Sequence, residues 1–219
     1  DQIVVIDDSS TDGTSEILSR YKDRIEVVRT RARTGSKSSA QQYGLKFIKG
    51  DIFITTDGDS VLDKNFIKNI LKRFGKSDVM AAAGYVKSIK YNWLTACRSL
   101  EYSVGQNIHK LAQSFMNYLF VVPGAAGAFD AKFFKKNLSF EHDTLTEDLD
   151  FTYKIHKLNK EIAFAPDAVA YTQDPPNMKS YINQVRRWYG GGWQNLLKHF
   201  DILKRPVQAL ELSMVYGEG

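Results

Sequence analysis

The stretch Ile52-Phe53-Ile54-Thr55-Thr56-Asp57-Gly58-Asp59 decides the fold. An apolar run of strand-forming residues ends in two carboxylates separated by a glycine. In open α/β sheets, ligands bind at the carboxyl ends of strands, and a hard divalent cation prefers oxygen ligands. Gly58 permits a tight turn and leaves the approach clear for a bulky ligand. The stretch therefore predicts a buried strand followed by a metal site. The alternative is a solvated turn, because a second Asp-x-Asp at Asp148 and Asp150 shows that this pattern also arises by chance.

The first third of the chain alternates strands with helices. Residues 3–6 are a β-branched apolar run that ends in Asp7-Asp8, and residues 25–28 form the next such run. Ile17, Leu18 and Tyr21 share one face of a helix between them. Ser36 is suited to cap a second helix, and Asp63 a third. This alternation predicts an α/β fold with a mainly parallel, doubly wound sheet and helices on both faces.

The remainder of the chain predicts further elements. Strands are expected at residues 79–85, 119–122, 162–165 and 169–171, and a long helix at residues 93–115. A helix is expected to start at Thr146, and another over residues 181–188 is expected to be broken by Gly190-Gly191-Gly192. Cys97, the single cysteine, cannot form an intrachain disulfide and is interpreted as a small core residue.

Composition describes an ordinary globular protein. The 219 residues are 43% hydrophobic and 25% charged, with a net charge of +5. Basic residues gather in residues 29–49 and again in residues 179–205, which suits phosphates, nucleic acid or an anionic membrane face. No signal peptide is expected. The longest apolar run, residues 115–129, is interrupted and shorter than the roughly 20 residues of a membrane-spanning helix.

Four motifs follow one another in the chain. They are Asp7-Asp8, Asp57-x-Asp59, Thr146-Glu147-Asp148 and Gln184-x-x-Arg187-Trp188. In this order and spacing they resemble the family 2 glycosyltransferases, and within them the membrane-embedded processive synthases of cellulose, chitin, hyaluronan and poly-N-acetylglucosamine. The resemblance runs from Ile3 to about Trp193, and residues 6–14 and 36–45 look like further members of the pattern.

The resemblance implies a GT-A fold and a role for each motif. Asp7 and Asp8 would hydrogen-bond the uracil and ribose of a UDP-sugar donor, with Lys37 near the nucleotide or its phosphates. Asp57 and Asp59 would hold Mg²⁺ or Mn²⁺ against the diphosphate.

Further motifs would serve catalysis and the carbohydrate acceptor. Asp148 would be the general base, with Glu147 beside it. Arg187 would lie against the diphosphate, and Trp188 would stack on the acceptor sugar. Gln184 of the same motif and Gly127, in a loop that resembles the acceptor-site loop of the family, are the other expected acceptor-binding residues.

These residue types suit displacement of UDP from a sugar. A metal ion and a guanidinium can neutralise the charge of the leaving diphosphate, and an arginine binds two of its oxygens at once. One base takes the proton of the acceptor hydroxyl. One base with one direct displacement inverts the anomeric carbon, so an α-linked donor gives a β-linked product.

The sequence also departs from the family pattern. Ser9 stands where glycine is usual, and Gln42 where asparagine is usual. The resemblance implies that this chain is a fragment lacking the first strand and the transmembrane helices. Residues 1–200 are expected to be the catalytic domain. Residues 201–219 are expected to be an interfacial or linker segment toward a membrane helix, which would put the domain at the cytoplasmic face of the plasma membrane.

Three alternatives remain at this point. One is a non-processive enzyme that adds a single sugar to a lipid phosphate or another acceptor. Another is a two-metal phosphoesterase or nuclease built on Asp7, Asp57 and Asp148, which the basic residues 29–49 would favour. The third is a non-catalytic scaffold. The preferred reading is an inverting transferase that moves a sugar, with UDP-N-acetylglucosamine as the first candidate, to a growing polysaccharide, without nucleic acid as a partner.

Overall fold

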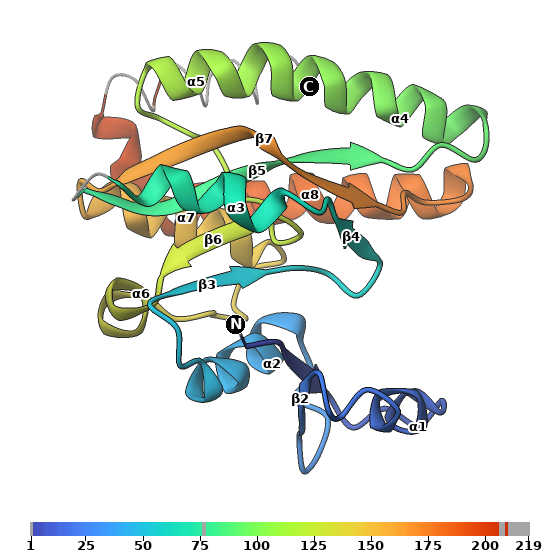
Figure 1. Ribbon diagram of the computed structural model, residues 1–219. Coiled ribbons are helices and arrows are strands. Elements are labelled where there is room, and N and C mark those ends of the chain that lie inside the picture. Colours follow the sequence, from blue (N-terminus) through green and yellow to red (C-terminus); the bar gives the residue numbers. More distant parts are fainter. Residues whose placement is uncertain (1, 76–77, 206–208, 210–219) are drawn as a thin grey trace. The chain divides into compact units, whose positions relative to one another are not determined.

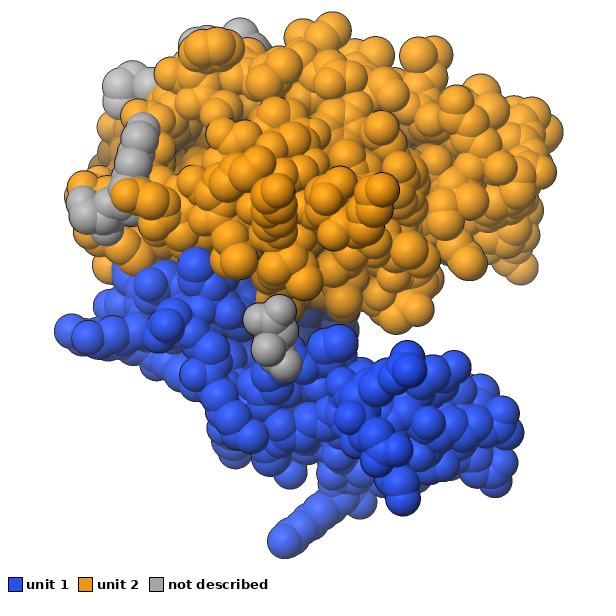
Figure 2. All heavy atoms as spheres, in the orientation of Figure 1, with its two compact units in different colours: residues 1–53, 130–143 blue, residues 54–129, 144–219 orange. Residues whose placement is uncertain are grey.

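The computed structural model describes residues 2–75, 78–205 and 209. The chain divides into two compact units, coloured separately in Figure 2. Unit 1 comprises residues 1–53 and 130–143, and unit 2 comprises residues 54–129 and 144–219. Strands β3 (Ile52–Thr55) and β6 (Gly127–Asp130) carry the chain across the boundary between the units.

Unit 1 is built on a pair of parallel strands. Its elements are β1 (Val4–Asp7), α1 (Thr14–Ser19), β2 (Glu26–Arg29), α2 (Lys37–Gly44), the 3-10 helix η1 (Leu45–Phe47) and α6 (Ala131–Asn137). Val5 lies opposite Val27 in the β1–β2 pair. The Phe134 ring of α6 packs edge-on against Phe53 and contacts Phe140. Both predicted strands are confirmed within one residue.

Unit 2 contains a larger, mixed sheet. Its further elements are β4 (Ser60–Leu62), α3 (Phe66–Leu71), η2 (Lys72–Gly75), β5 (Val79–Ser88), α4 (Trp93–Val104), the π-helix η3 (Gly105–Lys110), α5 (Leu111–Phe115), α7 (Glu147–Lys157), β7 (Glu161–Thr172), α8 (Met178–Lys198) and η4 (Phe200–Lys204). The strand order is β3-β6-β5-β7-β4. β5 pairs with β7 in parallel, whereas the β5–β6 and β4–β7 pairs are antiparallel.

Helices cover both faces of this sheet at β5. Successive residues of a strand point to opposite faces. At Gly84 a side chain would meet the Phe66 ring of α3 at 2.8 Å, so the glycine makes room for that helix. The next residue, Tyr85, accepts a hydrogen bond at its hydroxyl from Asn107 of η3 at 2.9 Å. Figure 1 shows α4 and α5 as one long helix running alongside β5 and β7.

The long helix exposes an apolar stripe, in contrast to expectation. The side chains of Leu100, Ile108 and Phe115 are 68%, 60% and 90% exposed. Cys97 is also exposed, so its prediction as a core residue is wrong. The inward side of the helix carries polar groups instead. Gln106 donates to Val86 O and accepts from Val86 N, which satisfies the backbone of β5.

Three other predictions are wrong in detail. Residues 119–122 are not a strand, because side chains satisfy their backbone: Phe120 N donates to Gln113 and Val122 N donates to Thr152. The two strands predicted in residues 162–171 form one strand, β7, with an irregular register near Gly84. The glycines 190–192 do not break their helix, since α8 continues to Lys198.

The predicted segment 201–219 is described only in part. η4 continues directly from α8, and Ile202 is fully buried with Leu149 and Tyr153. The rest of that predicted segment, residues 206–208 and 210–219, lies outside the described residues. Across the described part of the chain, no helix combines the length and the apolar character needed to cross a membrane.

A buried histidine makes the stability of unit 2 depend on pH. Burial lowers the pKa of His156 to about 4 from its usual 6.5. Its Nε2 donates to Leu119 O at 2.7 Å, so the neutral ring is the form that fits. We expect the free energy of unfolding to be full above pH 6.5 and to fall by about 3 kcal/mol as the pH drops from 6.5 to 4, because the unfolded chain takes up the proton first.

Urea unfolding at a series of pH values measures this effect. His156→Gln should flatten the pH dependence between 6.5 and 4. His109→Gln, which changes an exposed histidine of the same unit, should leave it as in the parent. The assignment is wrong if both variants retain the same slope.

Candidate active site

The two acids after β1 organise the loops of unit 1. Asp7 is 3% exposed and accepts from Ser10 N at 2.9 Å, Ser15 Oγ at 2.6 Å and Arg29 Nη1 at 2.8 Å. The Ser15 hydroxyl and the Ser10 donors, assisted by Arg29, lower the pKa of Asp7 to about 2. Asp7 is therefore an anion throughout the physiological range, and it ties the loop after β1 to β2.

Asp8 fixes the loop that follows β2. Its carboxylate accepts from Thr30 Oγ1 and from both the N–H and the hydroxyl of Thr34, all at 2.9 Å at their closest. Burial opposes its ionisation, but these donors outweigh burial and lower the pKa of Asp8. Parallel strands end at the same edge, so Asp7 and Asp8 join the two loops that leave β1 and β2 there. Lys37 is exposed at the first turn of α2, whose cap is Ser36, as expected.

Ser9 explains why glycine is usual at its position. Its φ of 55° lies in the left-handed region that favours glycine. The Ser9 hydroxyl donates to Thr30 O at 2.9 Å, which offsets part of the backbone cost. The other departure, Gln42, accepts from Phe140 N at 2.8 Å and so holds the segment after α6 to α2.

The Asp-x-Asp of the opening stretch lies in the loop between β3 and β4 in unit 2. Asp57 is half-buried, Asp59 is exposed, and a side chain at Gly58 would meet nothing within 4 Å. Two neighbouring carboxylates beside open space fit a divalent cation, which prefers oxygen ligands and keeps room for waters or phosphate oxygens.

A cavity brings this loop together with α8. About 490 Å³ in volume, it is lined by Asp59, Tyr91, Gln173, Asp174, Pro175, Pro176, Ser180 and Gln184. Two of its wall residues carry buried oxygens without a hydrogen-bond partner among the described residues, Asp174 Oδ2 and Gln184 Oε1. Buried acceptors rarely stay unpaired, so these two oxygens are an unusual feature of the residues that form the cavity wall.

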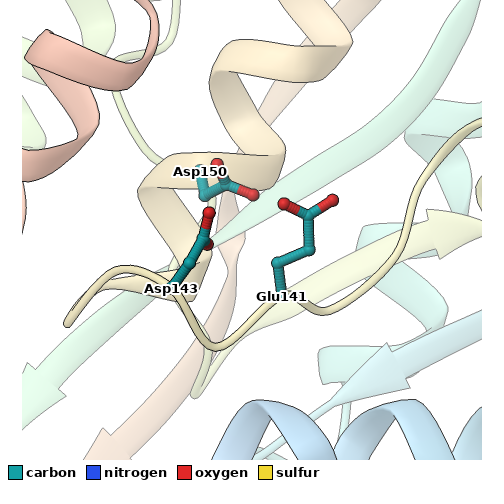
Figure 3. A group of neighbouring side chains, drawn as sticks. All are labelled: Glu141, Asp143 and Asp150. Carbon is teal, nitrogen blue, oxygen red and sulfur yellow. The ribbon is translucent and has the colours of Figure 1, made fainter.

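Asp148 lies in the first turn of α7. The helix begins after Thr146, as predicted, although the Thr146 side chain makes no capping hydrogen bond. Asp148 Oδ1 accepts from Leu149 N at 2.9 Å. The N-terminus of a helix favours a negative charge. Glu147 precedes it, also half-buried. Figure 3 shows Asp150 further along α7, with Glu141 and Asp143 on the loop that precedes the helix.

Asp150 joins α7 to the end of α8. It is 1% exposed and forms ion pairs with Lys154 and Lys198, each at 2.7 Å. His199 Nε2 donates to Asp150 Oδ1 at 2.8 Å. Burial opposes ionisation of Asp150, but His199, Lys154 and Lys198 outweigh burial and lower its pKa. The second Asp-x-Asp therefore joins one candidate catalytic residue to one structural carboxylate.

The start of α7 packs tightly on α8. Asn195 Nδ2 donates to Thr146 O and lies 3.0 Å from Thr146 Oγ1. A side chain at Gly191 would meet Thr146 Oγ1 at 2.4 Å. The glycine run therefore permits close approach of two segments, which is why it lies inside a helix. The contact holds the turn of Asp148 beside the helix of Gln184, Arg187 and Trp188.

The remaining predicted residues differ in exposure. Arg187 is exposed on α8, whereas Trp188 is half-buried. One face of Trp188 is occupied, since the guanidinium carbon of Arg98 lies 5.2 Å from its ring centre. Gly127 is buried, and a side chain there would approach Val122 and the Phe129 ring to 3.0 Å. The close packing around this position therefore favours glycine.

Two cationic side chains near the candidate site were not predicted from the sequence. Arg98 and Lys110 lie within the long helix at no recognisable motif. Burial lowers the pKa of Lys110 to about 8, and the negative charge of Asp148 opposes that shift. Lys110 therefore lies close enough to Asp148 for the two opposite charges to interact. Only the tertiary structure, which brings η3 and α7 together, shows this.

Comparison with known proteins agrees with this arrangement. A family model described as glycosyltransferase like family 2 matches residues 1–191, and the chain belongs to that family. It is 26% identical over 203 residues to the poly-beta-1,6-N-acetyl-D-glucosamine synthase of Staphylococcus epidermidis, covering 91% of this chain and 49% of the synthase. It is 27% identical over 200 residues to an N-acetylglucosaminyltransferase of Azorhizobium caulinodans, covering 85% of this chain and 50% of that protein. The chain thus spans about half the length of these curated relatives.

Solved structures share the fold. The mannosyltransferase PcManGT from Pyrobaculum calidifontis, in complex with GDP-Man and Mn²⁺, superposes with a TM-score of 0.74 at 22% identity, over 91% of this chain and 55% of that one. TarS 1-349 of S. aureus in complex with UDP-GlcNAc gives 0.62 at 20% identity, over 82% and 51%. The expected GT-A fold is confirmed, with a mixed sheet and helices on both sides.

The contact between Gly191 and Thr146 predicts opposite effects for neighbouring glycines. Gly190→Ala meets only Leu145 Cδ1 at 3.5 Å and should stabilise the protein by up to about 1 kcal/mol, because alanine favours helix over glycine. Gly191→Ala forces the backbone apart at Thr146 and should cost about 1–3 kcal/mol. Urea denaturation of the two variants measures both changes, and equal stability would contradict the packing role of Gly191.

Proposed function

We propose that this chain is the catalytic domain of an inverting glycosyltransferase that moves a sugar from a UDP-sugar to a growing β-linked polysaccharide. The observation that carries the proposal is the cavity whose wall joins Asp59 of the Asp-x-Asp motif to Gln184 of the Gln-x-x-Arg-Trp motif. The names of the relatives support N-acetylglucosamine as the sugar. Membership of the family argues against the phosphoesterase and nuclease hypothesis.

In this proposal, separate residues of unit 2 act as the base, bind the diphosphate and hold the metal ion. Asp148, kept charged at the helix start, takes the proton of the acceptor hydroxyl. The acceptor oxygen then attacks the anomeric carbon as the bond to UDP breaks, which inverts the configuration there. Arg187 offers a planar pair of donors to two diphosphate oxygens. Asp57 and Asp59 would hold Mg²⁺ or Mn²⁺, which supplies positive charge to the departing diphosphate.

Asp7, Asp8 and Lys37 are proposed to bind the donor nucleotide. Asp7 and Asp8 already hold the two loops that follow β1 and β2, so each would act by shaping the pocket as well as by direct contact. The acceptor is proposed to lie against Trp188, Gln184 and the Gly127 segment. A non-processive transferase remains the second candidate, and the length of the product separates the two.

Association with the cytoplasmic face of a membrane is also proposed. The stripe that includes Leu100, Val104, Ile108 and Phe115 is apolar and exposed along one side of the long helix. Such a surface exceeds the scattered apolar residues of ordinary protein surfaces and suits the boundary of a lipid bilayer.

Calorimetric binding of UDP, with and without Mn²⁺ and with ADP and GDP as controls, tests the donor site. GDP is the sharpest control, because PcManGT was solved with GDP-Man. Metal-dependent and uracil-selective binding supports the proposal. Absence of binding would be followed by the same titration on a longer chain, and failure there would refute the proposed donor.

Replacing Asp59 tests the metal site. Asp59→Ala should abolish the enhancement of UDP binding by Mn²⁺, because one of two carboxylate ligands is lost. Asp63→Ala, which changes an acid at the start of α3, is the matched control. Enhancement that survives in Asp59→Ala would remove Asp59 from the site.

Replacing Asp148 tests the base. Asp148→Asn should lower the transfer rate at least about 100-fold, because an amide cannot take the proton. UDP affinity should change by less than about twofold, since the side chain keeps its shape. Initial rates with UDP-N-acetylglucosamine, together with UDP calorimetry, measure both. Loss of rate and affinity in equal measure would assign Asp148 to binding instead.

Replacing residues of the apolar stripe tests membrane association. Leu100→Glu with Ile108→Glu should reduce flotation of the 219-residue chain with vesicles of phosphatidylglycerol and phosphatidylcholine several-fold, because two charges must then leave water. Val61→Glu with Ile67→Glu, which alters exposed apolar residues elsewhere in unit 2, should have little effect. Equal flotation of all variants would argue against this surface.

A further inference from the structure

Arg98 occupies an unusual place on α4. Its side chain is only 2% exposed. Three aromatic rings surround the guanidinium, with ring centres 4.8 Å away for Tyr102 and 5.2 Å away for both Tyr181 and Trp188. Tyr181 and Trp188 belong to α8, so this one side chain links the long helix to the helix of the Gln-x-x-Arg-Trp motif.

Two carboxylates pair with Arg98. Glu101, one turn along α4, forms a close ion pair with Nη1. Asp174, itself 1% exposed at the side chain, lies 3.5 Å from Nε. Arg98 Nε and Nη2 nevertheless have no hydrogen-bond partner among the described residues, and neither does Asp174 Oδ2. A buried ion pair is weak evidence for stabilisation, which leaves room for a role of this arrangement in the site.

The same group reaches the wall of the cavity. Asp174 lines it together with Gln184. The start of α4 holds the adjoining segment in place, since the Tyr91 hydroxyl donates to Asp174 O and Asn92 Nδ2 donates to Pro176 O at 2.9 Å. Arg98 therefore contacts both the aromatic ring and the carboxylate that border the place proposed for the acceptor.

We propose that Arg98 is a positioning residue that fixes the plane of Trp188 and the carboxylate of Asp174, and thereby sets the affinity for the acceptor sugar. The inference rests on the proposed function where it assigns Trp188 to the acceptor. Arginine suits the role because it stays charged, is planar and stacks on aromatic faces, whereas lysine offers a compact ammonium that does not stack. The guanidinium holds one face of Trp188, and the proposal assigns the sugar ring to the other face.

The first test measures the position of Trp188 without any sugar. It uses the protein with Trp93 and Trp193 replaced by phenylalanine, so that Trp188 is its single tryptophan. Acrylamide quenching of Trp188 fluorescence should increase about two- to threefold in Arg98→Met, which keeps the length of the side chain but removes its charge and stacking. Arg98→Lys should give an intermediate value.

Matched controls separate positioning from loss of folding. Arg73→Met breaks another arginine–carboxylate pair of unit 2, with Asp167, and should leave quenching unchanged. Arg98→Met with Asp174→Asn removes both charges, so the double variant should recover the melting temperature of the parent while Trp188 stays accessible. Unchanged quenching in this folded double variant overturns the proposal.

The second test measures kinetics in the full-length protein with a β-linked N-acetylglucosamine pentasaccharide as acceptor. Arg98→Met should raise the acceptor KM about tenfold and leave the UDP-N-acetylglucosamine KM unchanged, with partial rescue in Arg98→Lys. Equal increases in both KM values overturn the acceptor role. If the parent protein transfers no sugar, the proposed function fails, and the quenching result alone then decides whether Arg98 positions Trp188.

Discussion

The packing of α7 against α8 is the constraint on which the candidate active site depends. The base proposed for the reaction is on α7, and the residues proposed to contact diphosphate and acceptor are on α8. Asp150, in the first turn of α7, joins that helix to the end of α8 through Lys198 and His199. Asn195, one turn earlier in α8, adds a second link through Thr146. A buried carboxylate is stable only with such partners. If the helices slid past each other, the Asp150 carboxylate would lose its ion pairs or become exposed to water.

This constraint explains which sequence features could be interpreted locally. Strands in the first third of the chain, and the turn that carries Asp57 and Asp59, follow from short apolar runs and the residues that end them, and they were predicted within a residue. The start of α7 after Thr146 is likewise a local signal. The mixed direction of the larger sheet was not predictable, because strand pairing depends on contacts between segments far apart in the chain.

The errors have a common physical origin. Gly190, Gly191 and Gly192 favour a helix break when considered alone, but the approach of Thr146 needs the missing side chain, and tertiary packing overrides propensity. Cys97 and Leu100 follow helical spacing and were expected inside, yet the helix buries Arg98 and Gln106 instead. The spacing of apolar residues shows that a helix has an apolar face, but it does not show whether that face packs on the protein core or is exposed. Arg98 and Lys110 carried no signal, because their roles come from groups on α7 and α8.

The π-helix η3 has a consequence for how this long helix tolerates change. Its wider turn accommodates one more residue than an α-helix, between Trp93–Val104 and Leu111–Phe115. Deleting one residue there would restore α geometry and leave the segments before and after the turn in phase with each other. A one-residue deletion elsewhere in the long helix would instead rotate the downstream residues by about 100°. The wide turn is therefore the place where the helix can lose one residue without changing the faces that its two ends present.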